Sequence, residues 1–225
     1  MKKEVNYYID QSVADRELDK VIAELNSIRA NVAESVDVRA EKEREFVAKQ
    51  TTRLTAMFDL EEKLLKYRLD NSGSNQDIVK LKRQEALKKN NSTMLAKFMY
   101  SIGKVRPPSG EWEAHHIICS KHASHLRSKL RLFKNGMGIN DPSNGCWLPV
   151  DHKSAKGSLY PSAVGHKYLH TKKYAEHVLE TVGPARNKSA MSQSLKKLEK
   201  QLLSARDNEI IANLLTKKGK KDLLS

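Results

Sequence analysis

The chain has 225 residues, with 41 lysines and arginines against 27 aspartates and glutamates, which gives a formal net charge of +14. This length allows one or two domains with a proper core. The charge favours polyanionic partners such as nucleic acid, although acidic proteins and anionic membranes would also be attracted. The amino terminus has no apolar core segment, and no run of about eighteen apolar residues occurs. We therefore expect a soluble protein without a membrane span, and any export would not use a cleaved signal peptide.

The first part of the chain is predicted to be helical. Residues 1–72 contain neither glycine nor proline, and apolar side chains recur at spacings of three and four in residues 18–32 and 54–65. That spacing predicts one or two long amphipathic helices. The charged run at residues 41–45 is either a solvated part of a helix or a break between two helices.

A second helix is predicted after a stop signal. The Ser-Gly-Ser-Asn sequence at residues 72–75 ends the first pattern, and apolar residues then repeat at helical spacing over residues 78–102. Residues 1–106 are expected to form a helical hairpin or small coiled-coil bundle. The simplest interpretation is a packing or oligomerisation element, and the alternative is a module that docks to a secretion-apparatus or adaptor protein.

The composition changes sharply near residue 105. All six prolines, nine of the ten glycines, both tryptophans and all eight histidines lie beyond residue 100. Residues 111–225 carry 20 basic and 10 acidic side chains, whereas residues 1–110 carry 21 and 17. The histidine-rich half is thus the basic half. The Pro-Pro pair inside residues 103–110 marks a boundary, and we expect three regions: 1–106, 107–183 and 184–225.

Short elements with turn signals fill the middle region. We expect a strand over residues 111–118, a basic helix or turn over residues 121–134, and a second strand over residues 144–149. A helix is predicted from about residue 165 to 181. The last region is predicted to form one amphipathic helix through residue 214, followed by a solvated basic tail at residues 217–221.

Four of the eight histidines form two pairs in this region. His115 and His116 are adjacent on the predicted strand, so their rings point to opposite sides, while His166 and His170 are four residues apart on the predicted helix and leave one face of it. Only one of His115 and His116 can then join the helical pair around an ion, and the other is available as a base. Three imidazoles binding a divalent metal beside one unligated imidazole form a minimal hydrolytic site.

The order of these motifs resembles a known superfamily. The sequence Ala-His-His-Ile at 114–117, then Asn-Gly-x-Trp-Leu-Pro at 144–149, then His-x-x-x-His-x-x-x-Tyr at 166–174 is similar to the ββα-metal core of HNH and endonuclease VII nucleases. Within that superfamily the chain most resembles the AHH family, known chiefly as toxin domains of bacterial polymorphic toxin systems. The resemblance covers residues 111–180. It implies an α+β fold in which long helices flank a small ββα-metal core.

The resemblance also implies a role for each motif residue. His115, His166 and His170 would be the metal ligands, His116 the general base, and Asn144 the residue that braces the loop and orients His116. The cofactor would be one divalent ion, with Mg, Mn, Zn and Ni all open. A neutral imidazole can take a proton from water near pH 7, and a divalent ion stabilises negative charge on a phosphodiester as it is cleaved.

Other residues received weaker assignments. His122, His125, His152 and His177 have no such motif and are not expected in the site, and we expect Cys119 and Cys146 to be buried thiols rather than a disulfide or a zinc ribbon. The interval 150–164 is long for a simple join and is either a substrate-binding loop or a reason to reconsider the ligand set. Plausible phosphate contacts are Lys121, Arg127, Lys129, Arg131, Lys134, Lys153 and Lys156.

These observations predict a metal-dependent endonuclease acting on DNA. By resemblance it would be an antibacterial toxin or effector delivered by a route such as type VI secretion, held in the producer's cytoplasm beside an acidic immunity protein and acting in the target-cell cytoplasm. An alternative is a phage or restriction-type HNH endonuclease. Another is a noncatalytic helical scaffold whose histidines hold a structural zinc.

Overall fold

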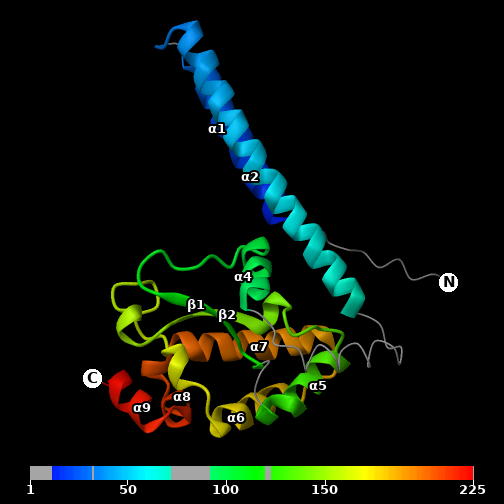
Figure 1. Cartoon of the computed structure of the whole chain (residues 1–225), viewed down its shortest axis with the longest axis vertical. Helices are drawn as coiled ribbons and strands as arrows, with labels where there is room; N and C mark the ends of the chain where they lie inside the picture. Colours follow the sequence, from blue (N-terminus) through cyan, green and yellow to red (C-terminus); the bar gives the residue numbers. More distant parts are fainter. Residues whose placement is uncertain (1–11, 32, 72–91, 120–122, 225) are drawn as a thin grey trace, which may run out of the picture. The chain divides into compact units, whose positions relative to one another are not determined.

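The computed structural model describes residues 12–31, 33–71, 92–119 and 123–224 (Figure 1). These residues are mostly helical and include one two-stranded antiparallel sheet, so the predicted α+β class is confirmed. No described helix is long and apolar enough to cross a membrane.

The described residues fall into two compact units. The first lies within Met1–Lys63 and Ser101–Gly103, and the second within Leu64–Tyr100 and Lys104–Ser225. The last two turns of one long helix, α2, therefore belong to the second unit, together with the sheet and all the described histidines.

The first unit consists mainly of two antiparallel helices, α1 (Val13–Ala30) and α2 (Val36–Asn71). Two contacts show that the helices are antiparallel. Arg29 at the end of α1 pairs with Glu43 near the start of α2, and the Ala14 amide at the start of α1 donates to a Glu61 carboxylate oxygen farther along α2 at 3.0 Å. The charged run at residues 41–45 lies inside α2 and is solvated, which settles the alternative in favour of a continuous helix.

The sheet joins β1 (Trp112–His116) to β2 (Gly145–Pro149), and both predicted strands are confirmed. In the register of the pair, His115 lies opposite Cys146 and His116 opposite Gly145. Gly145 is required here, because a Cβ at this position would lie 2.5 Å from the Met99 sulfur on α4 (Ser92–Ser101). Helix α4 thus packs directly on the β2 backbone.

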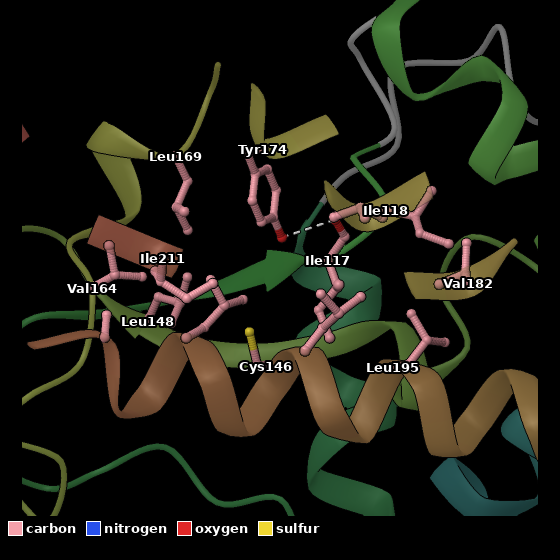
Figure 2. Packing of buried hydrophobic residues seen from close by; sticks show 14 of the residues in the cluster. Ile117, Ile118, Cys146, Leu148, Val164, Leu169, Tyr174, Val182, Leu195 and Ile211 are labelled. Carbon is pink, nitrogen blue, oxygen red and sulfur yellow. Dashed lines mark hydrogen bonds between the residues drawn. The ribbon is translucent and has the colours of Figure 1, made fainter. Parts of the chain in front are cut away.

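The main hydrophobic core lies between the sheet and the carboxy-terminal helices (Figure 2). Helix α7 (Lys188–Leu203) contacts both β2 and α6 (Lys172–Val182), and α5 (Leu126–Lys134) also packs on α6. Side chains from all of these elements and from the segment after β1 are fully buried. Among them are Ile117, Ile118, Leu132, Cys146, Leu148, Tyr174 and Leu195. Both cysteines are buried free thiols, as expected.

One helix prediction is corrected, and another can be compared with the structure only in its last part. The helix expected from about residue 165 begins only at Lys172, because the Thr171 side chain caps it by accepting from the Tyr174 amide at 3.1 Å. His166 instead begins a single 3₁₀ turn, η4 (His166–Tyr168), and His170 lies between η4 and α6. Of the helix expected over residues 78–102, α4 is described, and residues 78–91 lie outside the described residues.

The carboxy-terminal region is also more divided than predicted. The single helix expected after Pro184 is split into α7 and α8 (Glu209–Leu214) by the 3₁₀ turn η5 (Ala205–Asp207). The basic run predicted to be a solvated tail forms α9 (Lys217–Leu224). Its Gly219 lies so close to the Tyr168 ring that a Cβ there would be 2.6 Å from it, and Leu223 is buried. The tail is therefore a packed helix.

Candidate active site

Three histidines from separate segments converge at one end of the sheet. His115 is buried on β1, His166 is half-buried on η4, and His170 is exposed just before α6. Their ring centroids are 4.8 Å apart for His115 and His166, 5.1 Å for His166 and His170, and 6.2 Å for His115 and His170. These are the three residues that the motif resemblance proposes as metal ligands.

The spacing of these rings suits a common ion. Three imidazoles bound to one tetrahedral ion at about 2.1 Å would have their ring centroids about 5 Å apart. No group of three or more His, Cys, Asp or Glu side chains among the described residues forms a ready ligand set. The two observations are compatible, because ring centroids record that the imidazoles are gathered and not where their nitrogen atoms point. To bind one ion, the three imidazole rings would have to rotate until a nitrogen atom of each points to the same position.

The protonation of His115 also suits a ligand. Burial, followed by the nearby His166 and His170, holds the pKa of His115 well below its usual range. A neutral imidazole is the form that binds a metal ion. The exposure of the three rings increases from His115 to His170, so the cluster is open to solvent at His170.

A carboxylate orients His166. Glu113 Oε2 accepts a hydrogen bond from His166 Nδ1 at 2.6 Å, which leaves Nε2 as the nitrogen that could bind a metal ion. Glu113 and His115 are two residues apart on β1 and therefore share a face of the strand. A carboxylate behind a metal-binding histidine fixes its tautomer and raises its basicity. Glu113 is not predicted from the sequence, because its partner His166 lies 53 positions away.

Glu113 provides a test of this arrangement. We expect Glu113→Ala to weaken binding of Mn²⁺ or Zn²⁺ by about tenfold, because the His166 ring loses the partner that fixes its tautomer. Glu113→Gln keeps an oxygen acceptor and should lose less. Calorimetric titration measures both, with Glu176→Ala on α6 as the control, since Glu176 is exposed and pairs with Lys172 at 3.7 Å. Unchanged metal affinity in Glu113→Ala would argue against a ligand role for His166.

His116 points away from the histidine cluster. Its Nε2 lies 2.9 Å from Asn140 Oδ1, and because that oxygen can only accept, the Nε2 atom carries the hydrogen. In a neutral His116 ring the basic nitrogen is then Nδ1. The strand alternation expected for the His115–His116 pair is therefore what the structure has, with one ring beside the other histidines and the other ring bonded to Asn140.

Asn144 links the segment after His116 to the turn that carries Asn140. It is fully buried; its Oδ1 accepts from the Ile118 amide at 2.8 Å, and its Nδ2 donates to the carbonyl oxygens of Ile118 at 3.3 Å and Ile139 at 2.9 Å. Ile118 lies two residues after His116, and Ile139 directly precedes Asn140. One side chain thus fixes the segment that follows His116 and the turn that supplies the hydrogen-bond partner of His116.

The Asn140 turn is held in addition by the end of α2. The Asn140 amide donates to the Tyr67 hydroxyl at 2.9 Å, and Arg68 pairs with the buried Asp141 at 3.2 Å. Gly138 is needed there because a Cβ would meet the Tyr67 hydroxyl at 2.1 Å. The turn was predicted only as a turn, and neither the role of Asn140 nor the contact with residues 73 positions away had a local signal in the sequence.

Tyr174 lies beneath the histidine cluster. The ring is fully buried, and its hydroxyl donates to the Ile117 carbonyl oxygen at 3.1 Å (Figure 2). The same hydroxyl lies 3.4 Å from His115 Nε2. Burial raises the pKa of Tyr174 well above its usual range, so the phenol stays neutral. Helix α6 is thereby tied to the segment that follows β1.

The histidines left out of the predicted site have different surroundings. His122 lies outside the described residues. His125 is close to the cluster, with its ring centroid 5.7 Å from that of Tyr174. His152 bonds to the backbone at Gly165 and Gly219, and His177 lies 3.1 Å from Gln201.

The predicted phosphate contacts do not form one set. Lys121 lies outside the described residues, and on α5 Arg127 and Lys134 are exposed while Arg131 is half-buried. Lys129 is only 4% exposed, and burial lowers its pKa, so it does not present its ammonium group to solvent. Lys153 and Lys156 are exposed on and beside the 3₁₀ turn η3 (Lys153–Ala155), within the long interval after β2.

Comparison with known proteins agrees with this site. Residues 95–213, more than half of the chain, match the model of AHH, a nuclease family of the HNH/endonuclease VII superfamily with a conserved Ala-His-His motif. No curated protein and no solved structure gave a match. The matched residues include both strands, the Ala114-His115-His116 motif, Asn144 and the His166–His170 pair. The chain therefore belongs to the AHH family of HNH-superfamily nucleases.

Proposed function

We propose that this nuclease is a metal-dependent endonuclease that hydrolyses DNA phosphodiester bonds. The observation that carries the proposal is the opposite orientation of two adjacent side chains on β1. His115 lies with His166 and His170, whereas His116 is bonded to Asn140 on the other side of the strand. A closed structural zinc site has no use for such an additional, separately oriented imidazole.

The donor set fits a divalent ion held by His115, His166 and His170. Such an ion would supply positive charge for the phosphate and the leaving oxygen. His116 would take the proton from the attacking water, and Asn140 would keep the ring in the tautomer in which Nδ1 is basic. Asn144 would hold the segment after that base together with the turn that carries Asn140. Three neutral ligands leave the full charge of the ion available to the phosphodiester.

The test is cleavage by the purified protein. Plasmid DNA should be nicked and then degraded with added Mg²⁺ or Mn²⁺, a chelator should stop the reaction, and His116→Ala should be inactive under the same conditions. A parallel RNA substrate decides between the two nucleic acids. Intact plasmid and intact RNA across a series of divalent metals, together with tightly bound zinc, would support the scaffold alternative instead.

We also propose a biological role as an antibacterial effector, because the histidine and asparagine motifs resemble those of AHH toxin domains. In that role the protein would be made in the producer's cytoplasm, delivered by a specialised secretion system such as type VI into a target cell, and neutralised in the producer by an immunity protein. The excess positive charge of residues 111–225 favours an acidic inhibitor. Expression in a bacterium should cause growth arrest and DNA loss, and normal growth with a stable chromosome would count against a toxin.

A further inference from the structure

A second polar site lies beside Lys167 and Tyr168, the residues of η4 that follow His166. It is a pocket of 320 Å³ between the interval after β2, η4, and the region from η5 to α9. Its lining includes two carboxylates, Asp151 and Asp222, and five basic side chains, which leave an excess of three positive charges. The basic residues are Lys153, Lys156, Lys167, Arg206 and Lys218.

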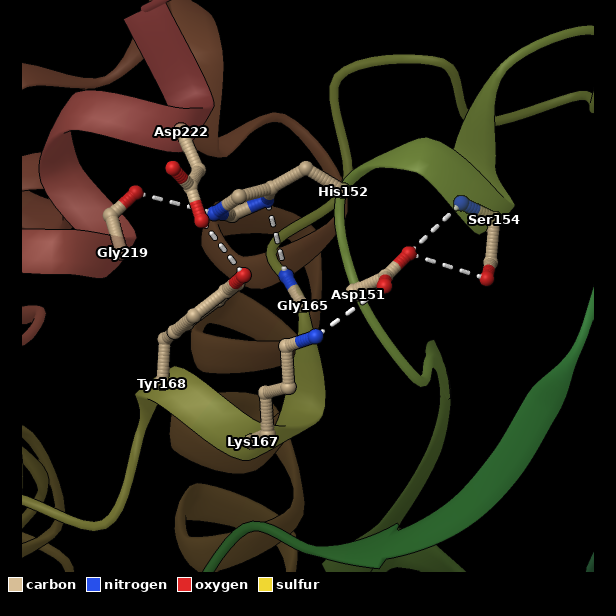
Figure 3. A network of polar contacts seen from close by, with 8 residues as sticks. All are labelled: Asp151, His152, Ser154, Gly165, Lys167, Tyr168, Gly219 and Asp222. Atoms are coloured by element: carbon tan, nitrogen blue, oxygen red, sulfur yellow. Dashed lines mark hydrogen bonds and ion pairs between the residues drawn. The ribbon is translucent and has the colours of Figure 1, made fainter.

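The base of the pocket is fixed by a hydrogen-bond network (Figure 3). His152 Nδ1 accepts from the Gly165 amide at 3.0 Å, and its Nε2 therefore carries the hydrogen that is donated to the Gly219 carbonyl oxygen, also at 3.0 Å. The His152 ring stacks on Tyr168 with ring centroids 4.7 Å apart. These contacts join three segments that are far apart in the sequence, so the pocket is already formed before any ligand binds.

The two carboxylates in the lining are already engaged. Asp151 bonds to Lys167 Nζ at 3.0 Å and to Ser154, and these contacts lower its pKa to about 2. Asp222 accepts from the Tyr168 hydroxyl at 2.7 Å. Both groups organise the pocket walls.

Three of the cations are uncompensated. The ammonium groups of Lys153, Lys156 and Lys218 make no ion pair or hydrogen bond with any residue that the structure describes, and Arg206 uses only its Nε, which donates to the Leu223 carbonyl oxygen at 3.0 Å. Unpaired positive charges around a preformed hollow attract anions and release the anions' counterions on binding.

We infer that this pocket is a phosphate-binding subsite for the nucleic-acid strand that the nuclease cleaves, and the inference rests on the proposed function. Lys167 and Tyr168 line the pocket, and His166, a candidate metal ligand, is the next residue along η4. A strand with its cleaved phosphodiester at His166 would therefore place a neighbouring phosphate in the pocket. Contacts of this kind position a substrate without reading its bases.

The experiment measures binding without cleavage. In the His116→Ala background and with a chelator present, a fluorescently labelled DNA duplex is titrated by anisotropy at several salt concentrations. The triple variant Lys153→Gln, Lys156→Gln, Lys218→Gln should bind about tenfold more weakly, and the slope of log K against log salt should fall by about 2 to 3, as expected for the loss of up to three phosphate contacts.

Two matched variants control for charge and folding. The triple variant Lys188→Gln, Lys196→Gln, Lys197→Gln removes the same charge from exposed positions on α7 and should change affinity by less than about threefold. Replacing the three pocket lysines with arginine should preserve binding. Equal losses in the two glutamine variants, or no loss in the pocket variant, would overturn the inference. Because no cleavage is measured, this outcome is distinguishable from an inactive enzyme, which would contradict the proposed function instead.

Discussion

Replacing His116 with alanine is expected to reduce turnover by about two to four orders of magnitude while metal affinity stays near that of the parent protein. The reason is structural. His116 is bonded to Asn140 on the side of β1 away from His166 and His170, so its loss removes a base without removing a ligand. Calorimetric titration with Mn²⁺ or Zn²⁺ beside a plasmid-nicking assay gives both quantities on the same protein preparation.

The ligand variants should behave differently. His115→Ala, His166→Ala and His170→Ala are each expected to weaken metal binding and to lose activity with it, and excess metal should restore part of the activity. His177→Ala is the control, because His177 bonds to Gln201 on α7 and should affect neither quantity. If His116→Ala abolished metal binding while His115→Ala left it intact, the two adjacent histidines would exchange roles.

The parts of this site that could be predicted are those with local sequence signals. The two strands follow from short apolar runs bounded by turn residues, and the opposite orientation of His115 and His116 follows from strand geometry. The spacing of His166 and His170 resembled a helix, but both residues precede the Thr171 cap of α6. They approach His115 from a 3₁₀ turn and an irregular segment. The three rings are therefore close together as predicted, but not because two of them share one face of a helix.

The residues that support the site could not be predicted in this way. Asn140 is held by Tyr67, and Glu113 meets His166 across 53 positions of sequence, so their roles exist only once the chain is folded. Tyr67 lies outside both the motif region and residues 95–213, which match the family. Likewise, the basic run in α9 looked solvated because lysine dominates it, whereas Gly219 and Leu223 provide its packing surface.

Asn144→Ala is expected to produce the largest loss of stability of any substitution at the site. Its three hydrogen bonds are buried, and removing the amide leaves the Ile118 amide and the carbonyl oxygens of Ile118 and Ile139 without that partner. Each buried polar group left unsatisfied costs about 1–3 kcal/mol, so the free energy of unfolding should fall by about 3 kcal/mol or more. A urea denaturation curve monitored by circular dichroism measures this change.

The same substitution should also reduce activity in protein that remains folded. Without the Asn144 amide, the segment after His116 and the turn that carries Asn140 are no longer tied together, so the base loses its fixed position relative to the histidine cluster. Turnover should therefore fall, and metal affinity should change little, because His115, His166 and His170 remain. Asn135→Ala is the matched control, since it removes one half-buried bond to the Arg131 carbonyl oxygen and should cost about 1 kcal/mol with activity retained. A stable, fully active Asn144→Ala protein would show that the loop keeps its conformation without this side chain.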